Sequence, residues 1–388
     1  MSVPVPFRLP CDPASWRTAV RHLRPATLAL ALKVLAVSTP LAAASFCVSN
    51  SAELQNALDI AASNGADDTI RLRTGNYPAP GGGFHYDSTE ERDLTLLGGH
   101  ILFLGGCART DKSPFATVLD GGGQERVLYL KVNRGVGGTG SPKLRIEGLK
   151  LYRGNGGPAD SGVGLLVFVL PATVFPVVEV VGNAIVENDT SGVIGGVSID
   201  VGNSSSVSVI GNLFVHNHGN GSANALGVVG GAGLDAFVNH NTFVDNFGGN
   251  GVLAFLSTEP SAAFWASNNL IWGNGGDYDF FLGVSGTVAL VSNNYPRSAN
   301  VNPTLELDRY AVDPKFVNAA GSNYDLTPDS PLAGIGATPP LGGYTTNDIL
   351  GRTRVTGAYV DLGAYEIQVL TSDSFESGTL AVWSAKRP

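Results

Sequence analysis

Four residues with ionisable side chains occupy one position of a repeated sequence motif. They are Arg153, Glu187, His216 and Asp245, and the same position in the next copy of the motif is Gly273. A cation, two carboxylates and a titratable imidazole on one face could carry out general acid and base chemistry on a sugar. The alternative interpretation is a solvated ladder of alternating charge, which stabilises a sheet modestly through cross-strand pairs.

The motif that carries this row is six residues long and begins and ends with asparagine. Its four copies span residues 183–188, 212–217, 241–246 and 269–274, and their first asparagines are 29, 29 and 28 residues apart. Each copy follows a short run of strand-forming residues, and the repeat has no helical periodicity. Strands at this interval can bury their apolar sides only by coiling, each pairing in parallel with its equivalent one turn later. The sequence therefore predicts a right-handed parallel β-helix, an all-β solenoid.

Stacked coils would place equivalent residues about 4.8 Å apart. The hydrophobic centre of the motif then becomes an internal file of Ile185, Phe214, Phe243 and Ile271. The asparagines form two columns, which we expect to bond along the stack as amide ladders, at turns whose left-handed backbone asparagine tolerates. The first column is Asn183, Asn212, Asn241 and Asn269, and the second is Asn188, Asn217, Asn246 and Asn274.

Weaker copies extend the repeat in both directions. Residues 144–154 match it with Leu149 and Gly154 in place of the two asparagines, and residues 288–295 match its first half. A second family of strand-like runs precedes the motif, so each coil carries at least two strands, and about six coils follow directly. Loops long enough to wall a groove are confined to residues 79–92 and 155–162.

The first 44 residues have the pattern of an export signal. A basic segment precedes an apolar run from Ala26 to Ala36 that only Lys33 interrupts, and small residues follow at 42–44. A membrane anchor is the alternative, which the short run and its lysine disfavour. We therefore expect an exported, secreted or cell-surface protein.

Charge and cysteine content narrow the range of partners. Residues 1–44 hold five of the 24 basic and one of the 33 acidic residues, so the remainder carries 19 against 32, a net charge of −13. Such a surface repels nucleic acid and anionic lipid, and strongly acidic polymers would need a metal or a local basic patch. Cys11 leaves with the signal segment, and the remaining pair, Cys47 and Cys107, favours a disulfide over two separate buried thiols.

Segments on both sides of the repeat match a known pattern. Near the N-terminus they are residues 51–61, 68–77, 96–99 and 117–122, and near the C-terminus they are residues 313–316, 324–326, 329–332, 351–352 and 360–366. These segments resemble secreted bacterial right-handed β-helix proteins with a pectate-lyase-like fold, of the choice-of-anchor Q kind. The resemblance implies an N-terminal helix cap and a closing segment, and it carries over no catalytic residue.

We divide the chain accordingly. A signal segment (1–44) precedes a β-helix domain (45–368), which holds a cap and first coils (46–143), regular coils (144–295) and a closing segment (296–368). Residues 369–388 resemble the short Phe-Glu-Ser-Gly and Trp-Ser tails of exported proteins, and we interpret them as an appended tail.

Three further groups of residues could bind a ligand. His216, His218 and His240 lie near one turn in sequence but lack a clear metal-site pattern, so we predict no metal there. Candidates for a Ca²⁺ or hydrolytic cluster are Asp200, Asp235, Asp277 and Asp279, but they form no repeating column, and turn roles explain them better. Aromatic residues in two adjacent coils could stack on sugars, and they are Trp265, Trp272, Tyr278 and Phe281.

These observations favour a monomeric protein that contacts polysaccharide along an outer β-helical face, without a cofactor and without evidence of catalysis. Two alternatives stay open. One is a polysaccharide lyase or glycoside hydrolase that uses the Arg153, Glu187, His216 and Asp245 row, and the other is a structural or adhesive surface protein. A groove with flanking walls would favour the enzyme.

Overall fold

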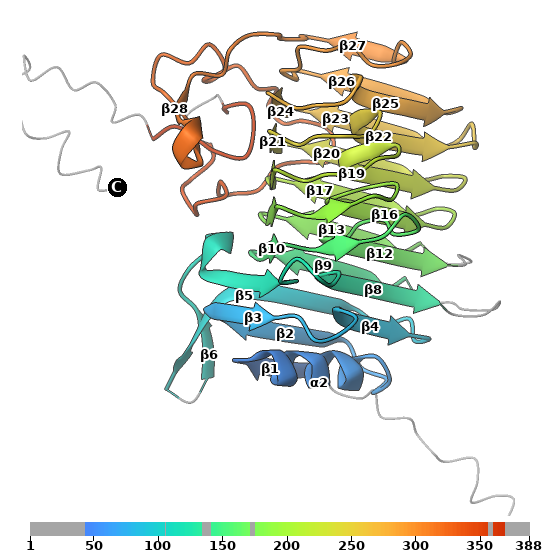
Figure 1. The fold of residues 1–388 in the computed structure, drawn as a ribbon, viewed down its shortest axis with the longest axis vertical. Coiled ribbons are helices and arrows are strands. Elements are labelled where there is room, and N and C mark those ends of the chain that lie inside the picture. Colours follow the sequence, from blue (N-terminus) through green and yellow to red (C-terminus); the bar gives the residue numbers. More distant parts are fainter. Residues whose placement is uncertain (1–42, 105, 134–140, 171–174, 356–359, 369–388) are drawn as a thin grey trace, which may run out of the picture. The chain divides into compact units, whose positions relative to one another are not determined.

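The computed structural model describes residues 43–104, 106–133, 141–170, 175–355 and 360–368. These residues form a right-handed parallel β-helix, as the sequence predicts. Three long sheets, named A, B and C, run along it (Figure 1). The predicted signal segment and the C-terminal tail lie outside the described residues, apart from positions 43 and 44.

Sheet A has eleven strands. Its parallel strands, in order, are β1 (Ala44–Val48), β2 (Asp68–Arg73), β5 (Leu94–Phe103), β9 (Lys143–Glu147), β13 (Val177–Val181), β17 (Ser206–Ile210), β20 (Asp235–Asn239), β23 (Ala263–Ser267), β26 (Thr287–Val291) and β27 (Leu305–Leu307). The eleventh strand, β6 (Gly106–Arg109), pairs antiparallel with β5 and makes a hairpin beside the first coils.

Sheets B and C have seven strands each. Sheet B contains β3 (Gly75–Pro78), β7 (Thr117–Asp120), β10 (Lys150–Tyr152), β14 (Ala184–Val186), β18 (Leu213–Val215), β21 (Thr242–Val244) and β24 (Leu270–Trp272). Sheet C contains β4 (Phe84–Ser88), β8 (Leu128–Asn133), β12 (Leu165–Leu170), β16 (Val197–Val201), β19 (Ala223–Gly230), β22 (Gly251–Ser257) and β25 (Tyr278–Val284). The smaller elements are the paired strands β11 (Asn155–Gly156) and β15 (Asp189–Thr190), the hairpin β28 (Phe316–Asn318) and β29 (Asn323–Leu326), and the 3-10 turns η2 (Pro114–Ala116) and η3 (Ala319–Gly321).

In-register parallel pairing builds the core. The central residues of β14, β18, β21 and β24 pair one above another, as the motif predicts, and they are fully buried. Phe214 stacks on Phe243 with ring centroids 4.6 Å apart. Each buried ring contributes about 1.5–3 kcal/mol through removal of apolar surface from water. This internal file is therefore one of the main sources of stability along sheet B.

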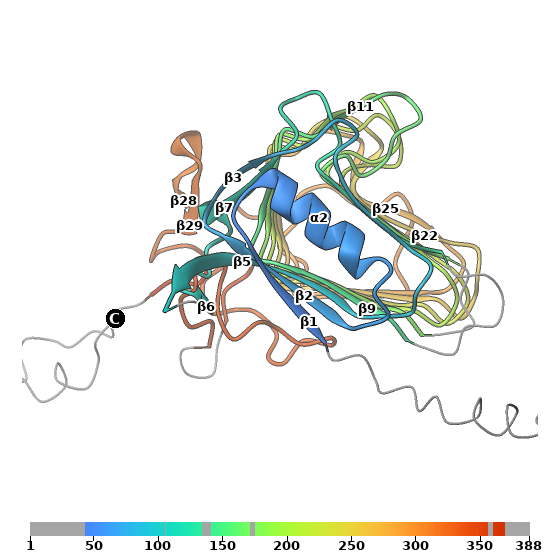
Figure 2. The same ribbon diagram turned by 90° about the horizontal axis from the view of Figure 1, so that it is seen from below.

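A helix covers the N-terminal end of the stack. Helix α2 (Ser51–Ala61) lies across the space between the three sheets, as Figure 2 shows. Its start is fixed by the N-cap Asn50, whose Oδ1 accepts from the Glu53 backbone N–H, while Glu53 Oε2 accepts from the backbone N–H of Ser49, just before the cap. Its apolar face, which includes Leu54 and Leu58, is buried against the first coils. No helix in the described residues is long and apolar enough to cross a membrane.

A disulfide joins Cys47 in β1 to Cys107 in β6, with 5.8 Å between the Cα atoms. The pairing is the one the sequence favours. Because it closes a 60-residue separation, it fixes the β5–β6 hairpin against the first strand and removes conformational freedom from the unfolded chain.

The closing segment packs on the outer face of sheet B (Figure 1). Leu213, Val215 and Val244 contact an apolar group formed by Tyr324, Ile349, Ala364 and Tyr365. A second group, Leu326, Leu332 and Leu362, packs on Leu270. The outer face of this part of sheet B is therefore buried, and so it is excluded as a surface for ligands.

Candidate functional site

Asparagine ladders fix the two corners that flank sheet B. Asn241 Oδ1 accepts from the backbone N–H of Asn212 at 2.9 Å and from its Nδ2 at 3.0 Å. Asn241 Nδ2 in turn donates to Val209 O at 2.8 Å and to Asn269 Oδ1 at 3.0 Å. The same pattern joins the other ladder asparagines, and Asn293, which lies in the half copy at residues 288–295, is a fifth member of the first ladder.

The left-handed backbone at these corners belongs to the residue before each asparagine, which corrects our expectation. At the second corner Glu187 and His216 have φ of 55° and Asp245 has 53°. The asparagine needs its side chain inside the stack, where it bonds to neighbouring coils, while the preceding residue makes the turn and points outward. The corner therefore presents one outward side chain per coil.

The row of Arg153, Glu187, His216 and Asp245 lies on this corner. Strand register places the four residues at equivalent positions of successive coils, since each follows the last residue of its sheet B strand. Arg153, Glu187 and His216 are exposed, and the Asp245 side chain is 44% exposed. Arg153 forms an ion pair with Asp120 of the preceding coil, and His216 Nε2 lies 3.9 Å from Asp245 Oδ2. The row is contiguous along the corner, but its contacts are separate, since Arg153 pairs with Asp120 outside the row and His216 lies near Asp245.

Beside the first half of this row lies a cluster that sequence reasoning missed. Lys150 Nζ is 3.9 Å from the centre of the Tyr152 ring. Arg153, which directly follows β10, has its guanidinium carbon 4.8 Å from the centre of the same ring. Burial lowers the pKa of Lys150. Burial and the nearby Glu187 carboxylate raise the pKa of Tyr152. An outward Lys-x-Tyr pair in β10 was the available signal.

The four candidate aromatic residues lie on three different sheets, and two of them, Tyr278 and Phe281, belong to the same strand β25. Trp265 points outward from sheet A, in register with Phe237 and Ala289. Trp272 belongs to sheet B and packs against the closing segment, and Tyr278 begins β25 of sheet C. The structure therefore does not bring them together as one sugar-stacking surface, because neighbours in sequence turn a corner between sheets.

The candidate histidines and aspartates do not lie together either. His240 is fully buried, and burial lowers its pKa well below the usual value, whereas His216 and His218 lie on either side of the second corner. Asp200 is half-buried on the outer face of sheet C, Asp235 and Asp277 are exposed, and Asp279 is buried against Arg297. Among the described residues no three His, Cys, Asp or Glu side chains could hold a metal ion together.

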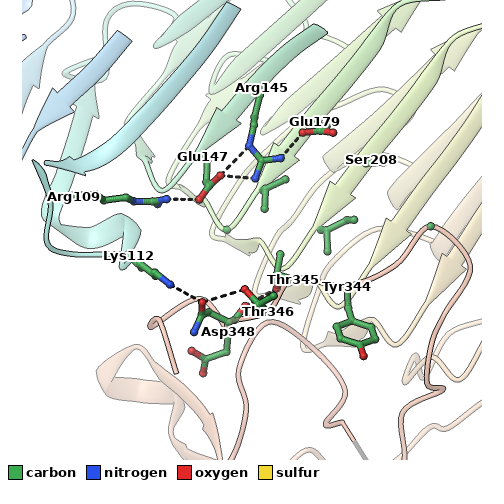
Figure 3. A pocket seen from close by; sticks show the side chains of 15 residues that line it. Arg109, Lys112, Arg145, Glu147, Glu179, Ser208, Tyr344, Thr345, Thr346 and Asp348 are labelled. Carbon is green, nitrogen blue, oxygen red and sulfur yellow. Dashed lines mark hydrogen bonds and ion pairs between the residues drawn. The ribbon is translucent and has the colours of Figure 1, made fainter. Parts of the chain in front are cut away.

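A pocket of about 440 Å³ lies between sheet A and the closing segment (Figure 3). Its floor is the outer face of β9, β13 and β17, and one side is formed by Arg109, the last residue of β6, and by Lys112, which follows that strand. The opposite side consists of residues 342 and 344–348 of the closing segment. The loops at 79–92 and 155–162, which we expected to wall a groove, do not line it.

Ion pairs hold the floor of the pocket rigid. Figure 3 shows Glu147 between Arg109 and Arg145, and Arg145 reaches on to Glu179 of the next coil. Lys143 Nζ adds a contact of 2.8 Å to Glu179. Burial opposes ionisation of both carboxyls, but the surrounding cations outweigh it and lower the pKa of Glu147 and of Glu179. The floor therefore stays charged and offers fixed donors and acceptors.

The closing segment supplies hydroxyl and amide groups opposite this floor. Lys112 Nζ donates to Asn347 Oδ1 at 2.7 Å, and the neighbouring lining residues are Tyr344, Thr345 and Thr346. Asn239 Nδ2 fixes this wall by donating to Leu341 O at 2.6 Å and to Gly343 O at 3.0 Å. Both sides of the pocket are therefore held in place before any ligand binds.

One outward file of sheet A continues from the pocket. In register it reads Arg145, Glu179, Ser208, Phe237 and Trp265. Gly342 of the pocket wall lies directly on Phe237, because a Cβ there would be 2.4 Å from the ring. The file therefore passes from charged groups through a hydroxyl to two aromatic rings.

Sequence reasoning missed the pocket because its walls come from segments far apart in the chain. The alternating charges of Lys143, Arg145 and Glu147 on one strand face were the available signal. No protein-family model matches this chain, and no match is found among curated proteins or among solved structures. The resemblance to choice-of-anchor Q proteins therefore stays a prediction, and the function must be argued from the site.

Proposed function

We propose that this protein is exported and binds an extended polysaccharide along the outer face of sheet A, with one end of the glycan in the pocket. The observation that carries the proposal is the register of the file from Arg145 to Trp265, which leads out of a preformed polar pocket. Successive coils are about 4.8 Å apart, so the file meets an extended chain at regular intervals, except at Phe237, whose ring Gly342 covers.

The chemistry of the file suits sugars. Charged and hydroxyl side chains such as Arg145, Glu179 and Ser208 can bond to sugar hydroxyl groups in defined directions. Trp265 is half-buried on the sheet and presents an aromatic surface for the apolar face of a sugar ring. The pocket, with Tyr344 and Thr346 opposite the ion pairs, has a volume within the usual range of small-ligand sites.

Export is supported by two features of the chain. The Cys47–Cys107 disulfide is a bond that persists in oxidising compartments. The signal-like pattern of residues 1–44 is the second. With a net charge of −13 for the remainder, the protein is suited to glycan rather than nucleic acid. We propose a secreted or cell-surface monomer that needs no cofactor to bind.

Residues 45–388 should be screened for binding to a panel of polysaccharides, and variants should be compared on the best ligand. We expect Trp265→Ala to weaken binding at least about tenfold and Tyr344→Ala to weaken it several-fold, since each removes a stacking or lining ring. Tyr129→Ala is the matched control, because Tyr129 is a half-buried aromatic residue on the outer face of sheet C. Equal affinity of Trp265→Ala and wild type would rule the site out, and the absence of any ligand would favour a structural role.

A second candidate function is acid and base catalysis on a glycan beside Arg153. The observation that favours it is Lys150, whose pKa burial lowers and which lies over Tyr152 near Glu187. Burial increases the fraction of Lys150 present as the neutral amine, which can accept a proton, and Arg153 could stabilise a developing negative charge. His216 and Asp245 would extend the same row along the corner.

Turnover should be followed through the absorbance of unsaturated products and through newly formed reducing ends. If this cluster is catalytic, Lys150→Met and Glu187→Gln should each abolish turnover while circular dichroism keeps the β-protein spectrum. Lys131→Met, which removes another outward lysine, serves as the control. Full turnover in Lys150→Met would exclude the cluster as the catalytic site.

A further inference from the structure

A second outward file runs along the corner, one residue after the second ladder asparagine. It consists of Asn155, Asp189, His218, Phe247 and Gly275. Parallel pairing joins the first four in register. Figure 2 places β11, where this file begins, at a corner away from β28, β29 and sheet A. The file is therefore separate from the pocket and from the surface proposed above.

The imidazole of His218 is clamped within this file. Nδ1 lies 2.6 Å from Asp189 Oδ1, and Nε2 lies 3.0 Å from Asn220 Oδ1. Its ring stacks on Phe247 with centroids 4.7 Å apart and planes inclined by 15°. Gly248 makes this arrangement sterically feasible, since a Cβ there would lie 2.5 Å from His218 Cδ2. One face of the Phe247 ring is therefore held against a fixed partner.

The ring of Phe247 is nevertheless accessible. The residue is 48% exposed, and the next position of the file is Gly275, which has no side chain to cover it. An aromatic surface that is already immobilised loses little conformational entropy when a ligand stacks on it. The geometry is therefore that of a preorganised platform rather than of a mobile surface side chain.

Polar groups lie beside and just after Gly275, the next position of the file. The Arg297 guanidinium donates to Gly275 O at 2.9 Å, to Gly276 O and to the buried Asp279 carboxylate. These contacts, with the Nε bond to Asp279, use four of its five N–H groups within the described residues. One N–H is left to donate to a ligand, and Asp277, two residues after Gly275 in the sequence, is exposed and can accept.

We propose that Phe247 is a stacking platform for the apolar face of a pyranose ring in a neutral glycan, with Arg297 and Asp277 as its hydrogen-bonding rim. The polar surroundings of one aromatic ring fit a small ring with hydroxyl edges better than a protein interface, whose centre would be a larger apolar patch. The proposal shares only its class of ligand with the proposed function and uses a different face of the β-helix.

The test uses residues 45–388 and four unbranched hexasaccharides as probes: β-1,4-glucan, α-1,4-glucan, β-1,3-glucan and β-1,4-mannan. Titration calorimetry should detect binding of at least one probe, weakened about five- to tenfold in Phe247→Leu and retained in Phe247→Tyr. In nuclear magnetic resonance spectra, the sugar C–H protons that stack on the ring should shift upfield with wild type and not with Phe247→Leu. Phe103→Leu is the matched control, since Phe103 is a 59% exposed ring on the β5–β6 hairpin.

Unchanged affinity in Phe247→Leu, or no binding of any probe to wild type, would overturn the platform. Trp265→Ala separates the two sites. A loss in Trp265→Ala alone would overturn the platform and leave the proposed function standing, whereas a loss in Phe247→Leu alone would support the platform and overturn binding along sheet A.

Discussion

Two columns of residues run side by side along the second corner, and one is constant in residue type whereas the other varies. The inward column is asparagine in four successive coils; the first three side chains bond to the coils on either side, and Asn274 bonds to the preceding coil. The outward column, one residue earlier, changes from Arg153 through Glu187, His216 and Asp245 to Gly273. The inward position must satisfy buried backbone groups, so one amide serves all coils, whereas the outward position meets water. Repetition along this solenoid therefore marks structural demand, and variation marks positions free for function.

The largest effect is expected when a ring of the internal hydrophobic file is removed. We expect Phe243→Ala to lower the free energy of unfolding by about 3–5 kcal/mol, because a fully buried ring is deleted between neighbours that cannot collapse. Denaturation followed by circular dichroism measures the loss. Phe103→Ala, at an exposed ring, should stay within about 0.5 kcal/mol of wild type. A loss below about 1 kcal/mol for Phe243→Ala would contradict the buried register.

Removal of one ladder amide should have the next largest effect. Asn241→Ala leaves the Asn212 backbone N–H, Asn212 Nδ2 and Val209 O short of a partner. Each buried group left without a partner costs about 1–3 kcal/mol, so we expect a loss of about 3 kcal/mol. Asn76→Ala removes an exposed amide and is the control for thermal denaturation. Equal melting temperatures of the two variants would contradict a structural role for the ladder.

The closing segment, which packs on sheet B, contains a buried carboxyl group, that of Glu366. Burial, and then the nearby Asp361, raise the pKa of Glu366 from 4.5 to about 8, although Arg354 acts in the opposite direction. The folded state therefore holds a proton that the unfolded chain releases above about 4.5. This contribution to stability is complete below pH 4.5 and is lost as the pH rises through about 8.

Thermal denaturation of wild type and Glu366→Gln between about pH 6.5 and 9 should reveal this proton. We expect the wild-type melting temperature to fall until about pH 8 and then level, and the Glu366→Gln curve to be flatter. The lower limit avoids His240, whose lowered pKa destabilises the fold as the pH falls below 6.5. Parallel curves for the two proteins would contradict a protonated Glu366.

Changes in the outward column should have the smallest effects. We expect His216→Ala to alter stability by about 0.5 kcal/mol or less, since its contact to Asp245 is long and exposed. Glu187→Gly should also be near neutral, because relief of the left-handed backbone offsets the greater freedom of the unfolded chain. Chemical denaturation resolves both. A loss of more than about 1.5 kcal/mol in the free energy of unfolding of either variant would mean that the residue has a structural role.

The sequence could predict the parts of this molecule that repeat. The spacing of the motif implied the strands, their register and the buried position of Phe243, because coils at a fixed interval stack equivalent residues. It could not predict the pocket, which needs the Arg109 segment and residues 342–348 folded back on sheet A. Trp272 shows the same limit, since its cover comes from the closing segment. Contacts between non-repeating segments depend on tertiary packing that no periodicity encodes.

The ladder geometry also bears on how long this protein can be. Each internal coil offers the next one the same set of bonds through two asparagines, mostly at intervals of 29 residues. A whole coil could therefore be duplicated or deleted in the gene without leaving an amide unpaired, and each such event would lengthen or shorten the outer faces by about 4.8 Å. In evolutionary terms the coils are interchangeable units, and the length of the outer face that contacts a polymer could change without a new fold.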